Sequence, residues 1–287
     1  MKISGFVDEI DIGFKKEVEV VKDLKMKFIE LRSIDGKNIS EMSLSEIDKI
    51  QKYLLEKNIE VSCIASPIGK INIENENFED EFTEHFKKFK NVIEIAKRLK
   101  VKYIRVFSFF LNKENKKKYE SIIFEKIESF LKEIDGTDLV LLHENEKGIY
   151  GDDIVSCLNL IELTKKNSNR FKLIFDPANF VQVGVSPLEA YEKLKRYVEY
   201  VHLKDAKYSS NENVLIGTGD GQIFEILREL KNDGYENFVS LEPHLINFST
   251  LQSLEHESIK DRKAEFKDGK EAFEISLKTL LEMINRI

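Results

Sequence analysis

The chain has 287 residues, 41% of them hydrophobic, which is enough apolar material for one large core. Its net charge of −7 argues against a nucleic-acid partner, because phosphate binding needs clustered Lys and Arg. The sequence contains no apolar run of about 18 residues, no signal-peptide pattern and only two cysteines, so we expect a cytoplasmic protein without a membrane span or a disulfide framework.

Short apolar segments alternate with longer segments of helical spacing along the whole chain. The segments expected as strands are 2–7, 28–32, 60–66, 103–108, 139–144, 172–176, 200–204 and 238–242. The segments expected as helices are 17–24, 45–58, 82–100, 119–134, 153–166, 187–197, 222–233 and 272–284. Strict alternation implies parallel strands, and eight units match a (β/α)8 TIM barrel. We therefore predict one α/β domain over residues 1–287.

Two further features bear on this fold. A doubly wound open sheet would show a Gly-rich phosphate turn after its first strand, and the segment SGFVDEI (4–10) has no such motif. Residues 245–270 are too long for a simple loop. We predict that they form an insertion after the last strand, at the end of the barrel that usually carries function.

Four consecutive predicted strands end in side chains that bind metals: Glu144, Asp176, His202 and Glu242. Neighbouring strands lie about 4.8 Å apart, so these side chains can converge. Three carboxylates held together repel one another unless a cation lies between them. Mostly oxygen ligands with one nitrogen favour Mn²⁺, with Mg²⁺, Co²⁺ and Zn²⁺ as alternatives. An ordinary hydrogen-bonded histidine is the competing interpretation of His202.

Five segments carry a family resemblance: LLHENEKGIYGDD (141–153), LIFDPANFVQVG (173–184), YVEYVHLKDA (197–206), LIGTGDGQI (215–223) and VSLEPHL (239–245). They resemble the sugar phosphate isomerase/epimerase group of the xylose isomerase-like TIM barrels. The resemblance implies the same four metal ligands. Glu144 matches an E-N motif, Asp176 a D-x-x-N motif, His202 an H-x-K-D motif, and Glu242 the ligand that closes the last strand.

Such a site predicts proton transfer next to a carbonyl. The ion would polarise the carbonyl of a sugar or sugar-like hydroxy-ketone and stabilise the resulting enediolate. Glu144 and Glu242 would act as the acid/base pair. The prediction is a metal-dependent isomerase or epimerase of carbohydrate metabolism. A dehydratase of an inosose-like cyclitol and a non-catalytic sugar-binding barrel are the alternatives.

Further residues are predicted to contact the substrate. Glu30 and Arg32 lie at the end of the second predicted strand, where an ordinary ion pair at the rim is the competing interpretation. Asn179 could instead cap a turn, and His244 follows the last metal ligand. Lys204 and Asp205 are predicted beside His202, with Asp205 as the partner of its second ring nitrogen.

The loop GTGDG (217–221) precedes a predicted helix. Its amide groups could hold a phosphate, and a flexible loop without a ligand is the alternative. The partner is therefore expected to be a small sugar, phosphorylated or not, and the exposed helices are compatible with a homodimer.

The chain departs from two branches of the superfamily. Tyr150, Asn179 and Tyr208 stand where the ketose 3-epimerase branch has Glu, His and Arg, so keto-hexose epimerisation does not follow from the resemblance. The endonuclease IV-like DNA repair branch needs additional histidines after the third, fourth and seventh strands. This chain lacks them, which argues against DNA repair.

Overall fold

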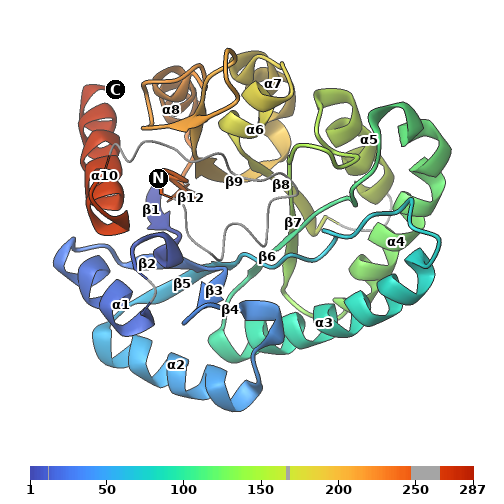
Figure 1. Cartoon of the computed structure of the whole chain (residues 1–287), viewed down its shortest axis with the longest axis horizontal. Helices are drawn as coiled ribbons and strands as arrows, with labels where there is room; N and C mark the ends of the chain where they lie inside the picture. Colours follow the sequence, from blue (N-terminus) through green and yellow to red (C-terminus); the bar gives the residue numbers. More distant parts are fainter. Residues whose placement is uncertain (12, 166–168, 247–265) are drawn as a thin grey trace.

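The computed structural model describes residues 1–11, 13–165, 169–246 and 266–287. Its main feature is an eight-stranded parallel sheet that curves into a barrel (Figure 1). The strands lie in the order β1-β12-β9-β8-β7-β6-β5-β2, and a parallel bridge between Phe6 and Glu30 joins the first to the last. Their bounds are β1 Lys2–Gly5, β2 Phe28–Leu31, β5 Glu60–Ile64, β6 Tyr103–Val106, β7 Val140–Glu144, β8 Phe171–Phe175, β9 Val198–Leu203 and β12 Phe238–Leu241.

Helices surround the barrel in the alternating order that the sequence predicts (Figure 1). Their bounds are α1 Phe14–Asp23, α2 Leu44–Lys57, α3 Phe78–Leu99, α4 Lys116–Glu133, α5 Ile154–Lys165, α6 Pro177–Gln182, α7 Pro187–Leu194, α8 Ile223–Asn232 and α10 Gly269–Arg286. The prediction of a TIM barrel is confirmed.

Local sequence signals explain where several helices begin. Ser43 and Glu46 form a capping box at the start of α2, because each side chain accepts from the backbone of the other residue. Ser186 caps α7, and Pro187 follows at its first position, where the missing N–H costs nothing. Asp176 caps α6 in the same way. This last cap matters for the site, because it orients a predicted metal ligand.

Two apolar layers hold the barrel together. Outside the strands, aromatic side chains of α3 and α4 meet, with the rings of Phe89 and Phe130 4.8 Å apart. Inside the barrel, Tyr200 stacks on Phe238 at 5.6 Å and contacts Tyr103 edge-on. Tyr200 lies two residues before His202 and therefore points to the same face of β9. The inner layer thus lies directly beneath the candidate site.

The sequence analysis missed three small elements near the rim. These are the hairpin of β3 (Ser33–Ile34) with β4 (Lys37–Asn38), the hairpin of β10 (Asp205–Ala206) with β11 (Asn213–Val214), and the short helix α6. Each has too few residues to show a hydrophobic period. Most of the predicted insertion at 245–270 lies outside the described residues.

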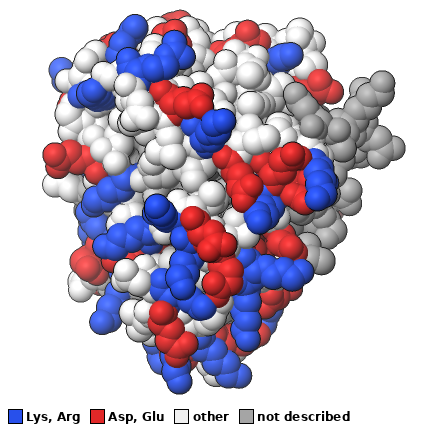
Figure 2. All heavy atoms as spheres, turned by 90° about the vertical axis from the view of Figure 1, so that its left-hand side faces the viewer, with Lys and Arg blue, Asp and Glu red and all other residues white. Residues whose placement is uncertain are grey.

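The surface carries both signs of charge. Acidic and basic side chains are interspersed over the face that Figure 2 turns to the viewer. Among the described residues, no helix combines the length and the apolar character that crossing a membrane requires.

Candidate metal centre

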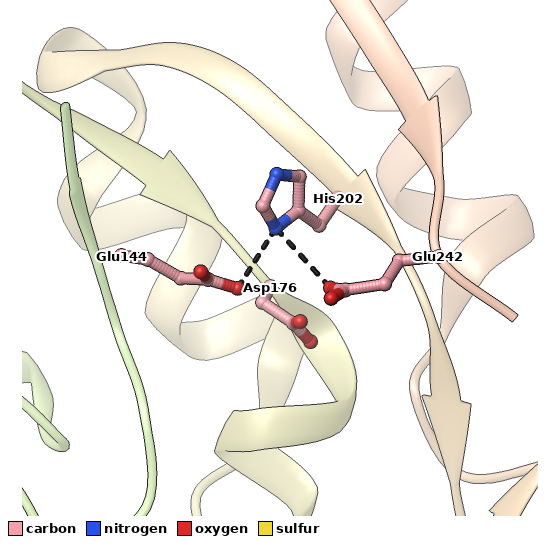
Figure 3. Close-up of side chains that lie close together, drawn as sticks. All are labelled: Glu144, Asp176, His202 and Glu242. Carbon is pink, nitrogen blue, oxygen red and sulfur yellow. Dashed lines mark hydrogen bonds and ion pairs between the residues drawn. The ribbon is translucent and has the colours of Figure 1, made fainter. Parts of the chain in front are cut away.

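Four side chains from four adjacent strands meet at the carboxyl end of the barrel (Figure 3). Glu144 ends β7, Asp176 follows β8, His202 lies near the end of β9, and Glu242 follows β12. One ligand atom from each lies within 4.8 Å of the others, and all four residues are buried. The structure therefore brings the four predicted ligands together.

His202 turns its Nδ1 atom toward two of the carboxylates (Figure 3). Nδ1 lies 2.8 Å from Glu144 Oε1 and 3.4 Å from Glu242 Oε2. Burial alone would lower the pKa of His202, but Glu144 and Glu30 outweigh it and raise that pKa well above its ordinary value. Nδ1 is thus the ring atom that faces the centre of the cluster.

An arginine holds the outer oxygen of each glutamate. Arg105 Nη1 donates to Glu144 Oε2, and Arg32 Nη1 donates to Glu242 Oε1, both over 2.9 Å. Burial would raise the pKa of both carboxyl groups. His202 and Arg105 instead lower the pKa of Glu144, and Lys204 and His244 lower that of Glu242. Both glutamates are therefore ionised near neutral pH.

Asp176 is fixed by the backbone of α6 and faces a lysine. Its Oδ1 accepts from the backbone N–H of Asn179 over 3.0 Å. Its Oδ2 lies 2.9 Å from Lys204 Nζ, but the approach lacks hydrogen-bond geometry. Burial raises the pKa of Asp176, Lys204 lowers it, and the net result is about 6.

The charges at this end of the barrel suit an additional cation. Counted over the described residues in contact here, six buried carboxyl groups face three buried, permanently cationic side chains. The acids are Asp8, Glu9, Glu30, Glu144, Asp176 and Glu242, and the cations are Arg32, Arg105 and Lys204. Even with protonated His202 as a fourth cation, the acids outnumber the cations by two, and an excess of negative charge is unfavourable in a buried site.

Two buried oxygens at the same place, Asp176 Oδ2 and Glu242 Oε2, make no hydrogen bond of good geometry, although Lys204 Nζ and His202 Nδ1 lie within ion-pair distance of them. Buried polar atoms normally have partners. A divalent ion would supply a partner to both atoms and offset most of the charge. Glu144, Asp176, His202 and Glu242 therefore fit such an ion by charge, by chemistry and by position.

Arg32 lies in a second acidic group beside the first. Its guanidinium donates to both oxygens of Asp8, to Glu9 Oε1 and to Glu242 Oε1, at 2.9 to 3.1 Å. It also lies 3.2 Å from His244 Nε2. His244 has the left-handed φ of 48°, and its backbone N–H donates to Glu9 Oε2. Arg32 is thus fully engaged with protein groups rather than forming a simple ion pair at the rim.

A polar pocket opens above the cluster. It is lined by Arg32, Lys70, Arg105, Glu146, Asn179, Gln182, Lys204, Asn213, Glu242 and His244. Four of the predicted substrate-binding residues are among them: Arg32, Asn179, Lys204 and His244. At its mouth Lys70 Nζ pairs with Glu146 Oε2 over 2.8 Å. The pocket therefore offers hydroxyl-binding groups next to the carboxylate cluster.

The structure corrects the placement of two predicted residues. Asp205 is not the partner of His202, because its carboxylate accepts from the amides of Gly217, Gly219 and Gly221 over 2.8 to 2.9 Å. Those amides are consequently not available to a phosphate. The second ring nitrogen of His202 faces Glu30 instead, at 3.3 Å. Glu30 is fully buried and lies below the cluster rather than at the rim.

The sequence analysis missed several residues that contact the cluster or line the pocket above it. Arg105 has one signal in the sequence, since it is a charged residue inside an otherwise apolar strand segment. Asp8 and Glu9 follow the first strand, as the ligands follow theirs, and that position alone could have marked them. Lys70 and Glu146 lie in loops and carry no comparable signal.

The sequence was also compared with known proteins. The family model for the xylose isomerase-like TIM barrel matches residues 18–274. The chain belongs to the xylose isomerase-like TIM barrel family. A search of curated protein sequences found no match.

Solved structures share this family's fold over nearly the whole chain. The IOLI protein with a binding zinc atom superposes with a TM-score of 0.76 at 16% identity, covering 100% of this chain and 99% of that one. A D-tagatose 3-epimerase-like protein gives 0.73 at 19% identity, covering 100% and 99%. The probable 3-DHS dehydratase AsbF from Bacillus anthracis gives 0.63 at 19% identity, covering 84% and 92%. At these identities the likeness establishes the fold alone.

Proposed function

We propose that this xylose isomerase-like barrel is a divalent-metal-dependent isomerase or epimerase of a sugar or sugar-like hydroxy-ketone. The observation that carries the proposal is the buried cluster of Glu144, Asp176, His202 and Glu242 beneath a polar pocket. These four residues would hold the ion. When bound, the ion would supply positive charge beside the substrate carbonyl and so acidify the neighbouring C–H bond.

The chain's own residues account for the proton transfer. Glu144 and Glu242 lie on opposite sides of His202, as Figure 3 shows, and are ionised near neutral pH. One carboxylate would take the proton from the carbon next to the carbonyl, leaving an enediolate. For isomerisation, the same carboxyl group would return that proton to the neighbouring carbon. For epimerisation, the second glutamate would take up a proton from solvent and deliver it to the opposite face, and the first would release its own proton to solvent at the end of the cycle. Arg32 and Arg105 orient the two carboxylates for this exchange.

The pocket would position the rest of the substrate. Asn179 reaches it from α6, His244 from the loop after β12, and Lys204 from the end of β9. These groups can donate to hydroxyl oxygens. Because Asp205 already binds the amides of the 217–221 loop, that loop does not supply a phosphate site.

A dehydratase is the second candidate, since loss of water from a hydroxy-ketone begins with the same proton removal. His244 Nε2 lies 3.2 Å from Glu242 Oε1, so a second proton-carrying group stands next to the base. The structures of similar fold include a probable 3-DHS dehydratase, which is in line with this alternative. An inosose-like cyclitol is the substrate type to test.

The test is a deuterium-exchange screen. The protein is incubated in D₂O with Mn²⁺, and in parallel with Mg²⁺, Co²⁺ or Zn²⁺, with a panel of ketoses, aldoses, keto-cyclitols and their phosphates. We expect label at the carbon beside the carbonyl of at least one compound. We also expect its loss after chelation and a decrease of at least about 100-fold in Glu144→Gln and Glu242→Gln. An enone or diketone absorbance would identify the dehydratase.

Glu199→Gln is the matched control, because Glu199 lies on β9 with His202 and contacts Tyr103 instead of the cluster. Its exchange rate should equal that of the wild type. Unchanged exchange in Glu144→Gln would contradict the proposed mechanism. A wild-type protein that binds no divalent ion would contradict the proposed metal centre.

A further inference from the structure

Glu30 is the one predicted substrate contact that lies beneath the metal centre. It comes from β2, which lies opposite β8 in the strand order of the barrel, and is completely buried. Its Oε1 atom lies 3.3 Å from His202 Nε2, the ring nitrogen that faces away from Glu144 and Glu242. His202 is also fully buried, so this contact is shielded from bulk solvent.

The other oxygen of Glu30 is held in place by two hydroxyl groups. Oε2 accepts from Tyr200 Oη over 3.0 Å and from Ser240 Oγ over 2.7 Å. The ladder between β2 and β5 changes register between Ile29 and Glu30, an irregularity of the kind that redirects a side chain. Glu30 is therefore fixed by its strand and by its neighbours.

Both ring nitrogens of His202 face a carboxylate oxygen: Nδ1 faces Glu144 over 2.8 Å, and Nε2 faces Glu30 over 3.3 Å. An imidazole that binds an ion through one ring nitrogen carries its hydrogen on the other. Because Nδ1 faces the cluster, its lone pair would bind the ion and the hydrogen would remain on Nε2. Glu30 Oε1 is the acceptor that lies beside that hydrogen.

The ring orientation is restricted as well. Phe6 meets the imidazole edge-on at 5.1 Å, and Tyr200 does so at 5.7 Å. The two aromatic rings limit rotation of the imidazole. Two orientations related by a ring flip remain, and only one of them directs an N–H group at the carboxylate of Glu30.

We propose that Glu30 is a positioning residue, which fixes the tautomer and orientation of His202 so that Nδ1 is the metal-binding atom. This inference rests on the proposed function, in which His202 holds a divalent ion. Carboxylate partners of this kind raise the basicity of a ligating histidine, and their loss typically weakens metal binding about 10- to 100-fold.

The first experiment measures Mn²⁺ affinity of the full-length protein by titration calorimetry, with free Mn²⁺ counted by electron paramagnetic resonance. Glu30→Gln keeps the shape of the side chain and removes its charge. We expect its Kd for Mn²⁺ to rise about 10- to 100-fold, while Glu199→Gln binds as the wild type does. A Glu30→Gln affinity within twofold of the wild type would overturn the inference and leave the metal centre standing.

The second experiment uses only the wild-type protein, so its result does not depend on whether a variant folds. Wild-type protein labelled with ¹⁵N-histidine is loaded with diamagnetic Zn²⁺, and the ring nitrogens of His202 are assigned by nuclear magnetic resonance. We expect a directly bonded proton on Nε2 and the metal-induced shift on Nδ1. A proton on Nδ1, or a metal-shifted Nε2, would overturn the inference. Failure of the wild type to bind either ion would overturn the proposed function together with it.

Discussion

Replacing Glu17 with Gln should stabilise the fold by an amount that grows as the pH rises. Glu17 lies in α1 with 1% of its surface exposed, and its Oε2 atom has no hydrogen-bond partner among the described residues. Burial, together with the nearby charges of Asp8, Asp35 and Asp11, raises the pKa of this carboxyl group from 4.5 to about 9.

The pH dependence of the folding free energy follows from the difference in the pKa of Glu17 between the folded and the unfolded chain. Below pH 4.5 the carboxyl group of Glu17 is protonated in both the folded and the unfolded chain, so it costs nothing. Between pH 4.5 and about 9 the unfolded chain loses the proton and the folded chain keeps it. Folded-state stability then falls by about 1.4 kcal/mol per pH unit, which amounts to roughly 4 kcal/mol at pH 7.5. Above pH 9 the cost is constant.

The assay is urea unfolding of wild type and Glu17→Gln at intervals from pH 4.5 to 9. The difference in unfolding free energy should be near zero at the acidic end and increase with pH. Glu19→Gln is the control, because Glu19 lies on the same helix but is only half-buried, and Lys57 lowers its pKa, so this variant should not gain stability as the pH rises. A difference that does not depend on pH would refute this account of Glu17.

Two further substitutions test the loops that surround the pocket. Asp205→Asn should destabilise the protein by about 3 kcal/mol in urea unfolding, because the amide cannot accept from all three glycine N–H groups of the 217–221 loop; an unchanged midpoint would contradict this. Gly69→Ala should lower the melting temperature far more than Gly136→Ala. Both glycines have positive φ, but a Cβ at Gly69 would lie 2.1 Å from Phe107 O, whereas Gly136 has open space; equal shifts would contradict the role of this contact.

Much of the fold follows from patterns that survive in a single sequence. The alternation of short apolar runs with amphipathic stretches predicts the barrel, because buried parallel strands and their covering helices differ in hydrophobic period. The ligand candidates follow from position, since the ends of parallel strands lie at one rim. Asp176 and Glu242 can be identified because each comes directly after an apolar run.

The contacts between side chains are harder to predict. Asp205 and Glu30 both follow the pattern of a carboxylate near a strand end, yet only Glu30 reaches His202. The register shift at Ile29/Glu30 and the hairpin that begins at Asp205 decide this, and neither has a sequence period long enough to recognise. Arg105 was missed for a related reason, because its partner Glu144 comes from the next strand and is identified only by three-dimensional proximity.

The closure of the barrel coincides with these polar contacts. β1 and β2 share the single Phe6–Glu30 bridge, whereas β1 and β12 share four paired residues. Two polar contacts lie at this junction. Arg32, which follows β2, donates to Asp8, which follows β1. Glu30 of β2 contacts His202 of β9. The closure of the barrel and the arrangement of the polar side chains in the site therefore depend on the same contacts. A bound ion or substrate that orders these side chains will also hold the first and second strands together.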